Sequence, residues 1–210
     1  MKIIFEHPPN KRMLLGVNYY DDYGRVIQVK SQNHLLGTDV VDNVYEFDGT
    51  LISSTRTHTV NGISTTIANT FTYDHMGRAK TTSQSINGAA ATVLSNLSYN
   101  ELGQLKEKKL HNGLQTNAYT YNERGWLKSS NAKVTATNSL IFSIELGYNS
   151  GGYPQFNGNI SGQSFMNNDF GTFKSFTYQY DKLNRLIKAE ISSTELSEVL
   201  SYDKIGNIAS

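Results

Sequence analysis

The sequence lacks cysteine altogether and contains only 3 prolines and a single tryptophan among its 210 residues. Without cysteine, the chain cannot form a disulfide, a thiolate zinc site, an iron–sulfur cluster or a cysteine nucleophile. It also lacks an excess of charge of one sign, because 19 lysines and arginines stand against 18 acidic residues. Binding to a polyanion draws on clustered positive charge. We therefore expect no nucleic-acid partner.

Long hydrophobic runs are absent as well. No window approaches the roughly 18 apolar residues that a spanning helix needs. Pro8 and Pro9 interrupt the opening segment before an apolar run of signal-peptide length can form. We expect no insertion into a membrane, and no signal peptide is visible in this chain. An apolar fraction of 38% and a mean hydropathy of −0.45 predict thin, half-solvated layers rather than a thick core.

Residue patterns for catalysis and metal binding are missing too. No G-x-S-x-G, P-loop or G-x-G-x-x-G pattern occurs. The sequence therefore predicts no catalytic, cofactor-binding or metal-binding residues and no enzyme activity. The histidines show no HxH or HExxH spacing, and they are His7, His34, His58, His75 and His111.

Tyrosine and glycine are present in numbers, 13 and 17, and one motif uses eight of the tyrosines and seven of the glycines. In each copy a tyrosine is followed by an acidic or amide residue, with glycine, or once asparagine, four places after the tyrosine. The start-to-start spacings are 25, 28, 26, 22, 27, 32 and 22, which indicates a repeat architecture. The tyrosine and the fifth residue of the eight copies are Tyr20 and Gly24, Tyr45 and Gly49, Tyr73 and Gly77, Tyr99 and Gly103, Tyr121 and Gly125, Tyr148 and Gly152, Tyr180 and Asn184, and Tyr202 and Gly206.

The motif residues predict a specific turn. The second position is Asp or Asn in seven copies and Glu46 in one, and Asx side chains open turns by bonding backbone amides two residues on. Glycine at the fifth position, replaced only by Asn184, suits a left-handed backbone. Together they predict a type I turn closed by a left-handed residue, as found in hairpins.

The residues around each turn alternate between apolar and polar, as in 71–73, 97–99, 119–121, 176–180 and 200–202, and this period of two is typical of a half-buried strand. Asn-Gly pairs at 61–62, 87–88 and 112–113 indicate a second class of hairpin turn between the motifs. We therefore predict an all-β fold, an antiparallel meander of hairpins forming a twisted, curved sheet or partial β-shell. Residues 1–210 are expected to form a single repeat domain, in which 150–172 is an enlarged loop or an extra hairpin.

The Y-D-x-x-G-R-L units at variable spacing resemble the YD repeats of the RHS family of bacterial cell-surface and secreted proteins. The resemblance covers residues 20 to 208, and within this range the stretches 121–127 and 154–162 also look like bacterial RHS chains. It implies a β-sheet that spirals into a hollow shell, which in that family commonly encloses a C-terminal toxin domain. It also implies an extracellular or cell-surface location. Because the chain ends at Ser210, two residues after the eighth motif, the resemblance covers the repeat scaffold and not the toxin, and we expect a segment of a larger RHS-type shell.

Two functions follow from this interpretation. The first is a non-catalytic structural scaffold that encapsulates or displays a secreted toxin or surface domain. Its partner would be the remainder of a larger RHS chain, or another copy, through the unpaired edges of the sheet. The second is a carbohydrate- or protein-binding module that contacts surface glycans through the exposed aromatic residues Trp126, Tyr153 and Phe156. Against the second, the regular recurrence of tyrosine favours aromatic packing between successive hairpins.

Overall fold

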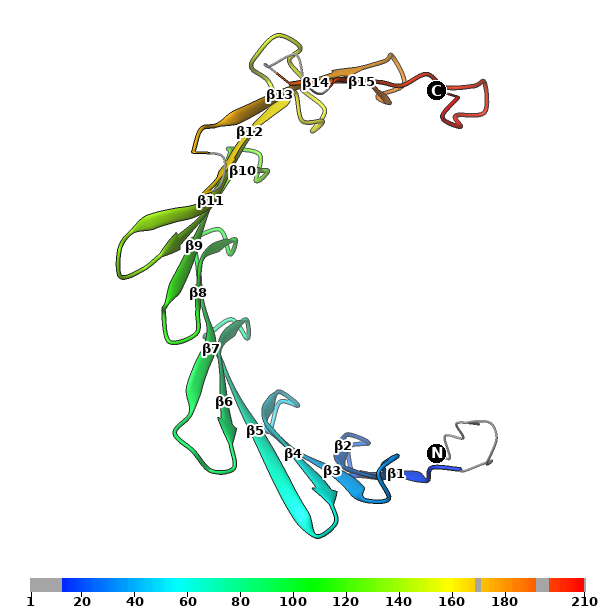
Figure 1. Ribbon diagram of the computed structural model, residues 1–210, viewed down its shortest axis with the longest axis vertical. Coiled ribbons are helices and arrows are strands. Elements are labelled where there is room, and N and C mark those ends of the chain that lie inside the picture. Colours follow the sequence, from blue (N-terminus) through cyan, green and yellow to red (C-terminus); the bar gives the residue numbers. More distant parts are fainter. Residues whose placement is uncertain (1–12, 169–170, 192–196, 210) are drawn as a thin grey trace. The chain divides into compact units, whose positions relative to one another are not determined.

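The computed structural model describes residues 13–168, 171–191 and 197–209. Within them it contains strands, turns and loops but no helix, so none of them forms an apolar helix long enough to cross a membrane. The strands form one antiparallel sheet in which the order in space is the order in the sequence, from β1 to β15 (Figure 1). This confirms the predicted all-β meander. In this order β1 and β15 stand at opposite ends, so the meander does not close.

The strand boundaries follow the motif, because most strands preceding a motif turn end at its tyrosine. The strands are β1 (Gly16–Tyr20), β2 (Val26–Gln32), β3 (Thr38–Tyr45), β4 (Leu51–Val60), β5 (Ile63–Tyr73), β6 (Ala79–Ile86), β7 (Thr92–Tyr99), β8 (Leu105–Leu110), β9 (Gln115–Tyr121), β10 (Leu127–Val134), β11 (Ser139–Gly147), β12 (Gly162–Asn167), β13 (Lys174–Tyr180), β14 (Leu186–Ile191) and β15 (Ser197–Val199).

The chain comprises two compact units. Unit 1 consists of residues 1–97 and 110–113, and unit 2 of residues 98–109 and 114–210. Unit 1 therefore holds β1 to β6 with most of β7, and unit 2 holds β9 to β15 with most of β8. A single domain over residues 1–210 stays a prediction.

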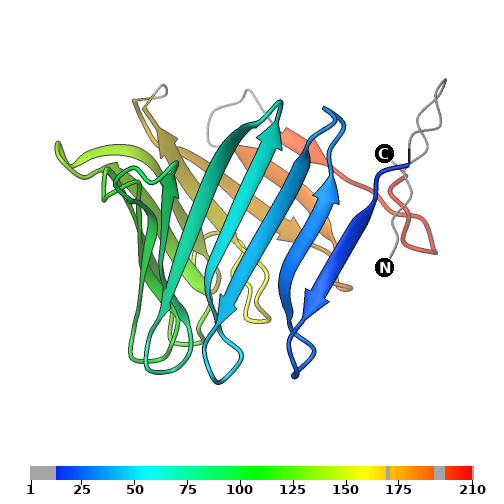
Figure 2. The same cartoon turned by 90° about the horizontal axis from the view of Figure 1, so that it is seen from below.

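Turns lie at both ends of the strands, and we name the two sets by their residues. The motif-turn row of unit 1 consists of 21–25, 46–50 and 74–78. The opposite-turn row of unit 1 consists of 33–37, 61–62, 87–91 and 111–113. Figure 2 shows the motif turns of the first strands at the lower ends of the ribbons and the opposite turns at the upper ends.

The sheet has almost no enclosed core, as the low apolar fraction predicted. Among the described residues, the only buried apolar side chains are Tyr148 and Ile191. One face carries the motif tyrosines, and the other is rich in hydroxyl groups that hydrogen-bond across neighbouring strands. Examples of these cross-strand pairs are Thr59 with Ser64, Thr120 with Ser129 and Ser164 with Ser175.

Two segments test the finer predictions. Residues 150–172 contain a loop and then β12, which pairs with both β11 and β13, so the first predicted alternative, an enlarged loop, leads into a regular strand of the sheet. The predicted strand at 200–202 is wrong, because Tyr202 makes only an isolated bridge to Ile208. A strand ladder needs a second strand of some length, and the chain there consists mostly of the turn at 203–207.

Candidate functional site

The motif turns are the most strongly organised part of the chain, and the turn at 21–25 shows how they are built. The Gly24 amide donates to the Asp21 carbonyl at 3.0 Å, and the Asp21 amide donates to the Arg25 carbonyl at 3.0 Å. Asp21 Oδ1 accepts from the amides of Tyr23 and Arg25 at 3.0 and 2.9 Å. Gly24 has φ of 77°. This is the predicted Asx turn closed by a left-handed residue.

Left-handed backbone occurs at the fifth motif position in seven of the eight copies. Asn184, with φ of 62°, takes the same conformation as the glycines. The register of the flanking strands shifts by one residue at the tyrosine or just after the turn in several copies, as expected of a bulge next to such a turn. The positive-φ members are Gly24, Gly49, Gly77, Gly103, Gly125, Asn184 and Gly206.

The sixth copy is the exception, and the prediction for Gly152 is wrong. Positive φ falls on Gly151 (90°), one residue earlier. After Tyr148 the chain does not return at once into a strand but enters the loop that precedes β12. The Gln155 amide donates to the Tyr148 carbonyl at 2.6 Å, so the loop is closed over a longer span. Pro154, which occupies the seventh motif position, supplies no amide hydrogen for a strand ladder.

The second copy reaches the same turn by another route. Its backbone bonds are intact, with the Gly49 amide donating to the Glu46 carbonyl at 3.0 Å. The contact to the closing amide comes from Asp48, whose Oδ1 accepts from the Thr50 amide at 2.9 Å. A glutamate side chain is one methylene longer than the Asx side chains that form these turns. Asp48 therefore supplies the side-chain acceptor in this copy.

In three copies the carboxylate at the second motif position also forms an ion pair with the arginine at the sixth position. Arg25, Arg78 and Arg185 each form an ion pair with the second motif residue, at 2.6 to 2.7 Å. The hydrogen bond from the Arg78 side chain, helped by two backbone amides, lowers the pKa of Asp74 to about 2. Backbone and side-chain hydrogen bonds from Arg185 likewise lower the pKa of Asp181.

The motif tyrosines link each repeat to the one before it. Six of the eight hydroxyls donate to a main-chain carbonyl 16 to 22 residues earlier, at 2.7 to 3.1 Å, usually that of the apolar residue two places after the preceding glycine. Tyr20, in the first copy, makes only a 3.4 Å contact with the Asn18 amide group. The donor and acceptor pairs are Tyr45 and Val26, Tyr73 and Leu51, Tyr121 and Leu105, Tyr148 and Leu127, Tyr180 and Ile160, and Tyr202 and Leu186.

The sixth motif position covers the tyrosine of the next repeat. The Arg25 guanidinium lies 5.1 Å from the centre of the Tyr45 ring, and Arg185 lies 4.5 Å from that of Tyr202. These are cation–π distances. Sequence reasoning missed both this contact and the tyrosine hydroxyl bond. The signal for the second was that phenylalanine never replaces the motif tyrosine, although the chain has 9 phenylalanines.

Trp126, one of the predicted glycan contacts, occupies this same sixth position in its repeat. Its ring lies 5.0 Å from that of Tyr148, and the Arg124 guanidinium lies 5.1 Å from it on the turn side. A methyl group at Gly158 would come within 3.3 Å of the indole. Trp126 therefore packs between repeats, whereas Tyr153 and Phe156 are exposed.

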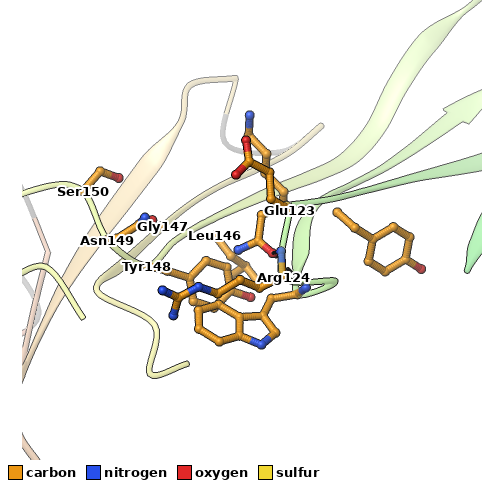
Figure 3. A pocket seen from close by; sticks show the side chains of 11 residues that line it. Glu123, Arg124, Leu146, Gly147, Tyr148, Asn149 and Ser150 are labelled. Carbon is orange, nitrogen blue, oxygen red and sulfur yellow. Dashed lines mark hydrogen bonds between the residues drawn. The ribbon is translucent and has the colours of Figure 1, made fainter. Parts of the chain in front are cut away.

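A pocket of about 490 Å³ opens beside this aromatic pair (Figure 3). Its apolar lining residues are Tyr121, Trp126, Leu146 and Tyr148. Polar groups come from the turn after β9, from Lys128 in β10 and from the segment after β11, and Figure 3 shows the Arg124 side chain beside Tyr148. The polar lining residues are Asn122, Glu123, Arg124, Lys128, Asn149 and Ser150.

The titratable groups elsewhere do not assemble into a recognisable metal centre. Within the described ranges no group of three or more His, Asp and Glu side chains is placed to hold an ion. His58 does bond Asp39 on the neighbouring strand, and hydrogen bonds from His58 and Asn33 lower the pKa of Asp39 against the opposing effect of burial, which is larger than any one of them. Asn33, the first residue of the turn at 33–37, also donates to the Thr59 carbonyl at 3.3 Å. These contacts hold the turn against the neighbouring strand β4.

Comparisons with known proteins agree with this architecture. No protein-family model matches the chain, and no curated protein matches it. A solved Tc holotoxin pore from Photorhabdus luminescens, carrying a mutation in TccC3, matches with a TM-score of 0.56 and 15% identity over 93% of this chain and 14% of that chain. The similarity therefore shows a shared fold, and this chain spans about a seventh of that chain's length.

Two further structures match with lower scores. A TcdB2–TccC3–Cdc42 crystal structure has a TM-score of 0.42 and 12% identity, over 92% of this chain and 15% of that one. A porin-like protein from Bacteroides uniformis has a TM-score of 0.32 and 10% identity, over 93% and 85%. These two scores are too low to carry an argument. With the motif and the shared fold of the first match, the repeat region is RHS-like.

Proposed function

We propose that this chain is a non-catalytic scaffold, one section of an RHS-type shell that encloses or displays a toxin or surface domain outside the cell. The observation that carries the proposal is the hydrogen bond from six of the eight motif tyrosines to the preceding repeat. Such a bond joins any repeat to its neighbour, so the same unit can be added without limit. A single layer whose described residues include only two buried apolar side chains suits a wall better than a compact ligand-binding domain.

The conserved use of backbone acceptors supports the same role. A carbonyl is available at the required place whatever the side chain, so the tyrosine bond tolerates Val26, Leu51 or Ile160 as acceptor. The varied spacings between motifs are therefore compatible with a regular wall. The fold shared with a section of a much longer toxin chain is the second support.

The test is limited proteolysis of the native protein, captured from culture fractions with an antibody against residues 71–127. We expect capture from the extracellular or surface fraction of a protein much longer than 210 residues. It should contain a segment outside the repeats that resists protease until the repeats are denatured. Capture from the cytoplasm alone, or uniform digestion of all segments outside the repeats, would contradict the proposal.

A second candidate function, carbohydrate binding, rests on the pocket beside Trp126. Its combination of an aromatic wall with Asn122, Asn149 and Glu123 matches the amphipathic surface of a sugar ring. Trp126→Ala is a poor probe, because this side chain also packs on Tyr148. The better test is affinity electrophoresis in soluble polysaccharides with Lys128→Ala. This substitution changes a polar residue that lines the pocket and leaves the contact between Trp126 and Tyr148 in place.

The chain offers a matched control for that test. A pocket of about 430 Å³ beside the preceding motif is lined by Tyr99, Asn100, Glu101, Leu102 and Lys106, without a tryptophan. Lys106→Ala changes the equivalent lysine there. Retardation of the parent that Lys128→Ala abolishes and Lys106→Ala leaves intact would support binding in this pocket. Equal mobility of all three in every polysaccharide would remove the second candidate.

A further inference from the structure

Each motif turn of unit 1 presents a large apolar side chain to solvent at its tip. Tyr23, Phe47 and Met76 occupy the third or fourth position of their motifs and are 79%, 95% and 68% exposed. Turn tips are normally polar, because they are the most solvated part of a chain. In unit 2, taken by itself, Leu102, Leu183 and Ile205 occupy the fourth motif position and are exposed in the same way.

The opposite-turn row of unit 1 also presents apolar side chains, but among residues without charge. Leu36 is exposed in its first turn, and Ile63 and Ile86 are exposed at the strand ends that flank its second and third turns. Residues 33–37, 60–63, 86–92 and 110–114 contain no aspartate, glutamate, lysine or arginine. Four successive solvent-facing turns without a charged side chain are unusual on a soluble protein, and exposed apolar groups of this kind mark interaction surfaces.

The two rows have the same spacing. Each row has one turn for every two strands, so apolar tips recur about every 9.5 Å along both rows. A second sheet of this kind, displaced along the strand direction, would bring its motif-turn row against the opposite-turn row of the first, with tip facing tip at every hairpin.

Charge decides among the three ways in which two such sheets could meet. The motif turns of unit 1 carry acidic groups without an ion-pair partner in the turn, including Asp22 and Glu46, so two motif-turn rows would repel each other. Two opposite-turn rows would meet without repulsion, but they would leave Tyr23 and Phe47 exposed. Contact between unlike rows covers both sets of apolar tips and places no acidic group against another.

We propose that this protein associates with a second copy of itself through contact between the motif-turn row of one copy and the opposite-turn row of the other. Such a head-to-tail contact uses different surfaces on the two partners, so each copy keeps one free row and can recruit another. Association therefore proceeds to an open series of oligomers. The contact is independent of the shell function, and it does not involve the edge strands β1 and β15.

The test is sedimentation velocity of the full chain over a range of concentrations, with two variants. The motif-row variant carries serine at Tyr23, Phe47, Met76, Leu102, Leu183 and Ile205. The opposite-row variant carries Leu36→Asn and threonine at Ile63 and Ile86. It also carries threonine at Leu114 and Phe173, which are exposed at the same ends of the strands, directly before β9 and β13. A control variant replaces polar turn neighbours of the tips with serine, at His75, Lys182 and Lys204. Circular dichroism and thermal melting verify that all three variants fold.

We expect the parent and the control to form dimers, trimers and larger species as concentration rises, and each row variant alone to stay monomeric. An equimolar mixture of the two row variants should form a dimer and nothing larger, because each partner contributes one intact row. A motif-row variant that still dimerises alone would overturn the proposal in favour of contact between like rows. Association that neither variant alters, or a parent that stays monomeric up to millimolar concentration, would overturn it as well.

Discussion

The motif-turn row and the opposite-turn row solve the same problem of reversing the chain, yet only one of them repeats in sequence. In the motif-turn row, a left-handed glycine recurs at the fifth motif position of every turn, and aspartate stands at the second position in two of the three turns. In the opposite-turn row, 61–62 is a two-residue Asn-Gly turn, 87–91 is longer, and 33–37 is built differently again. A turn that only closes a hairpin can therefore vary in both its sequence and its length.

The difference arises because each motif turn does more than reverse the chain. The second motif residue fixes the arginine at the sixth position, and in the first and seventh copies that arginine covers the tyrosine of the next repeat. That tyrosine in turn bonds back to the carbonyl after the turn. The ion pair, the cation–π contact and the tyrosine hydrogen bond thus all depend on the geometry of one turn. This dependence explains why the motif residues recur from turn to turn.

The turn at 33–37 blurs this contrast, because it copies the motif geometry without its sequence. Asn33 Oδ1 accepts from the Leu35 and Gly37 amides at 3.1 and 2.9 Å, as Asp21 does in its turn. Leu36 takes the left-handed position with φ of 68°. Glycine follows it at 37, because the Thr59 carbonyl passes directly beside this residue.

The largest expected effect is at this imitation turn. A methyl group on Gly37 would lie 1.8 Å from the Thr59 carbonyl oxygen, so Gly37→Ala must displace β4 or open the turn. We expect a loss of about 3 kcal/mol in the free energy of unfolding, measured by urea denaturation. Gly16→Ala is the control, since its nearest neighbour is a carbon atom at 3.9 Å. Equal stability of the two variants would show that Thr59 does not confine this position.

The motif row itself is best broken at its left-handed residue. Gly77 has φ of 74° and open space around it, so Gly77→Ala introduces backbone strain and nothing else. The expected loss is about 1 to 2 kcal/mol. Gly152→Ala should leave the urea midpoint unchanged, because Gly152 is in open space and outside the left-handed region. A matching loss at Gly152 would mean that the sixth copy forms the regular turn after all.

The link between repeats is expected to contribute less than the turn. Tyr73→Phe removes the hydroxyl that donates to the Leu51 carbonyl at 2.9 Å and keeps the ring. We expect a loss of about 1 kcal/mol, the usual net value of such a bond. Tyr20→Phe is the control, because its hydroxyl has only the 3.4 Å contact within its own strand. If both substitutions proved silent in urea denaturation, the tyrosine bond could not be what joins the repeats.

The contrast between the rows also explains which structural features could be predicted from the sequence. Asx and glycine spacing predicted the motif turns and the meander, because both depend on residues within five positions. The tyrosine bonds and the cover supplied by Arg25 or Trp126 depend on the register between repeats, and spacings of 22 to 32 residues do not reveal register. Nothing in the residues 33–37 signalled a left-handed leucine, because the conformation follows from Asn33 and Thr59.

A substitution that makes the turn at 33–37 more like a motif turn should stabilise the protein. Leu36→Asn places at the left-handed position a residue that tolerates it, as Asn184 does in the seventh motif. Leu36 is 72% exposed, so little packing is lost. We expect a gain of about 0.5 to 1 kcal/mol in urea denaturation. Leu35→Asn, at the neighbouring position without positive φ, should give no gain, and a gain there would point to solubility instead of backbone strain.

The smallest expected effect is the pH dependence of the motif-turn carboxylates. Because hydrogen bonding to Arg78 lowers the pKa of folded Asp74 from 3.8 to about 2, this group stabilises the fold fully above the pKa of the unfolded carboxyl. That contribution is lost as the pH falls from about 4 toward 2. Asp74→Asn keeps the acceptor for the Met76 and Arg78 amides but removes the ion pair.

The stability difference between the parent and Asp74→Asn should therefore shrink as the pH falls through this window, as measured by thermal melting at several pH values. Arg78→Gln removes the other partner and should lose the same pH dependence; Gln104 occupies that position beside Asn100 in the fourth motif, where the amide pair is joined at 2.8 Å without charge. A difference that stays constant down to pH 2 would show that the turn is held by its backbone and amide contacts alone. The motif-turn row would then resemble the opposite-turn row in its energetics and differ from it only in its contacts to the next repeat.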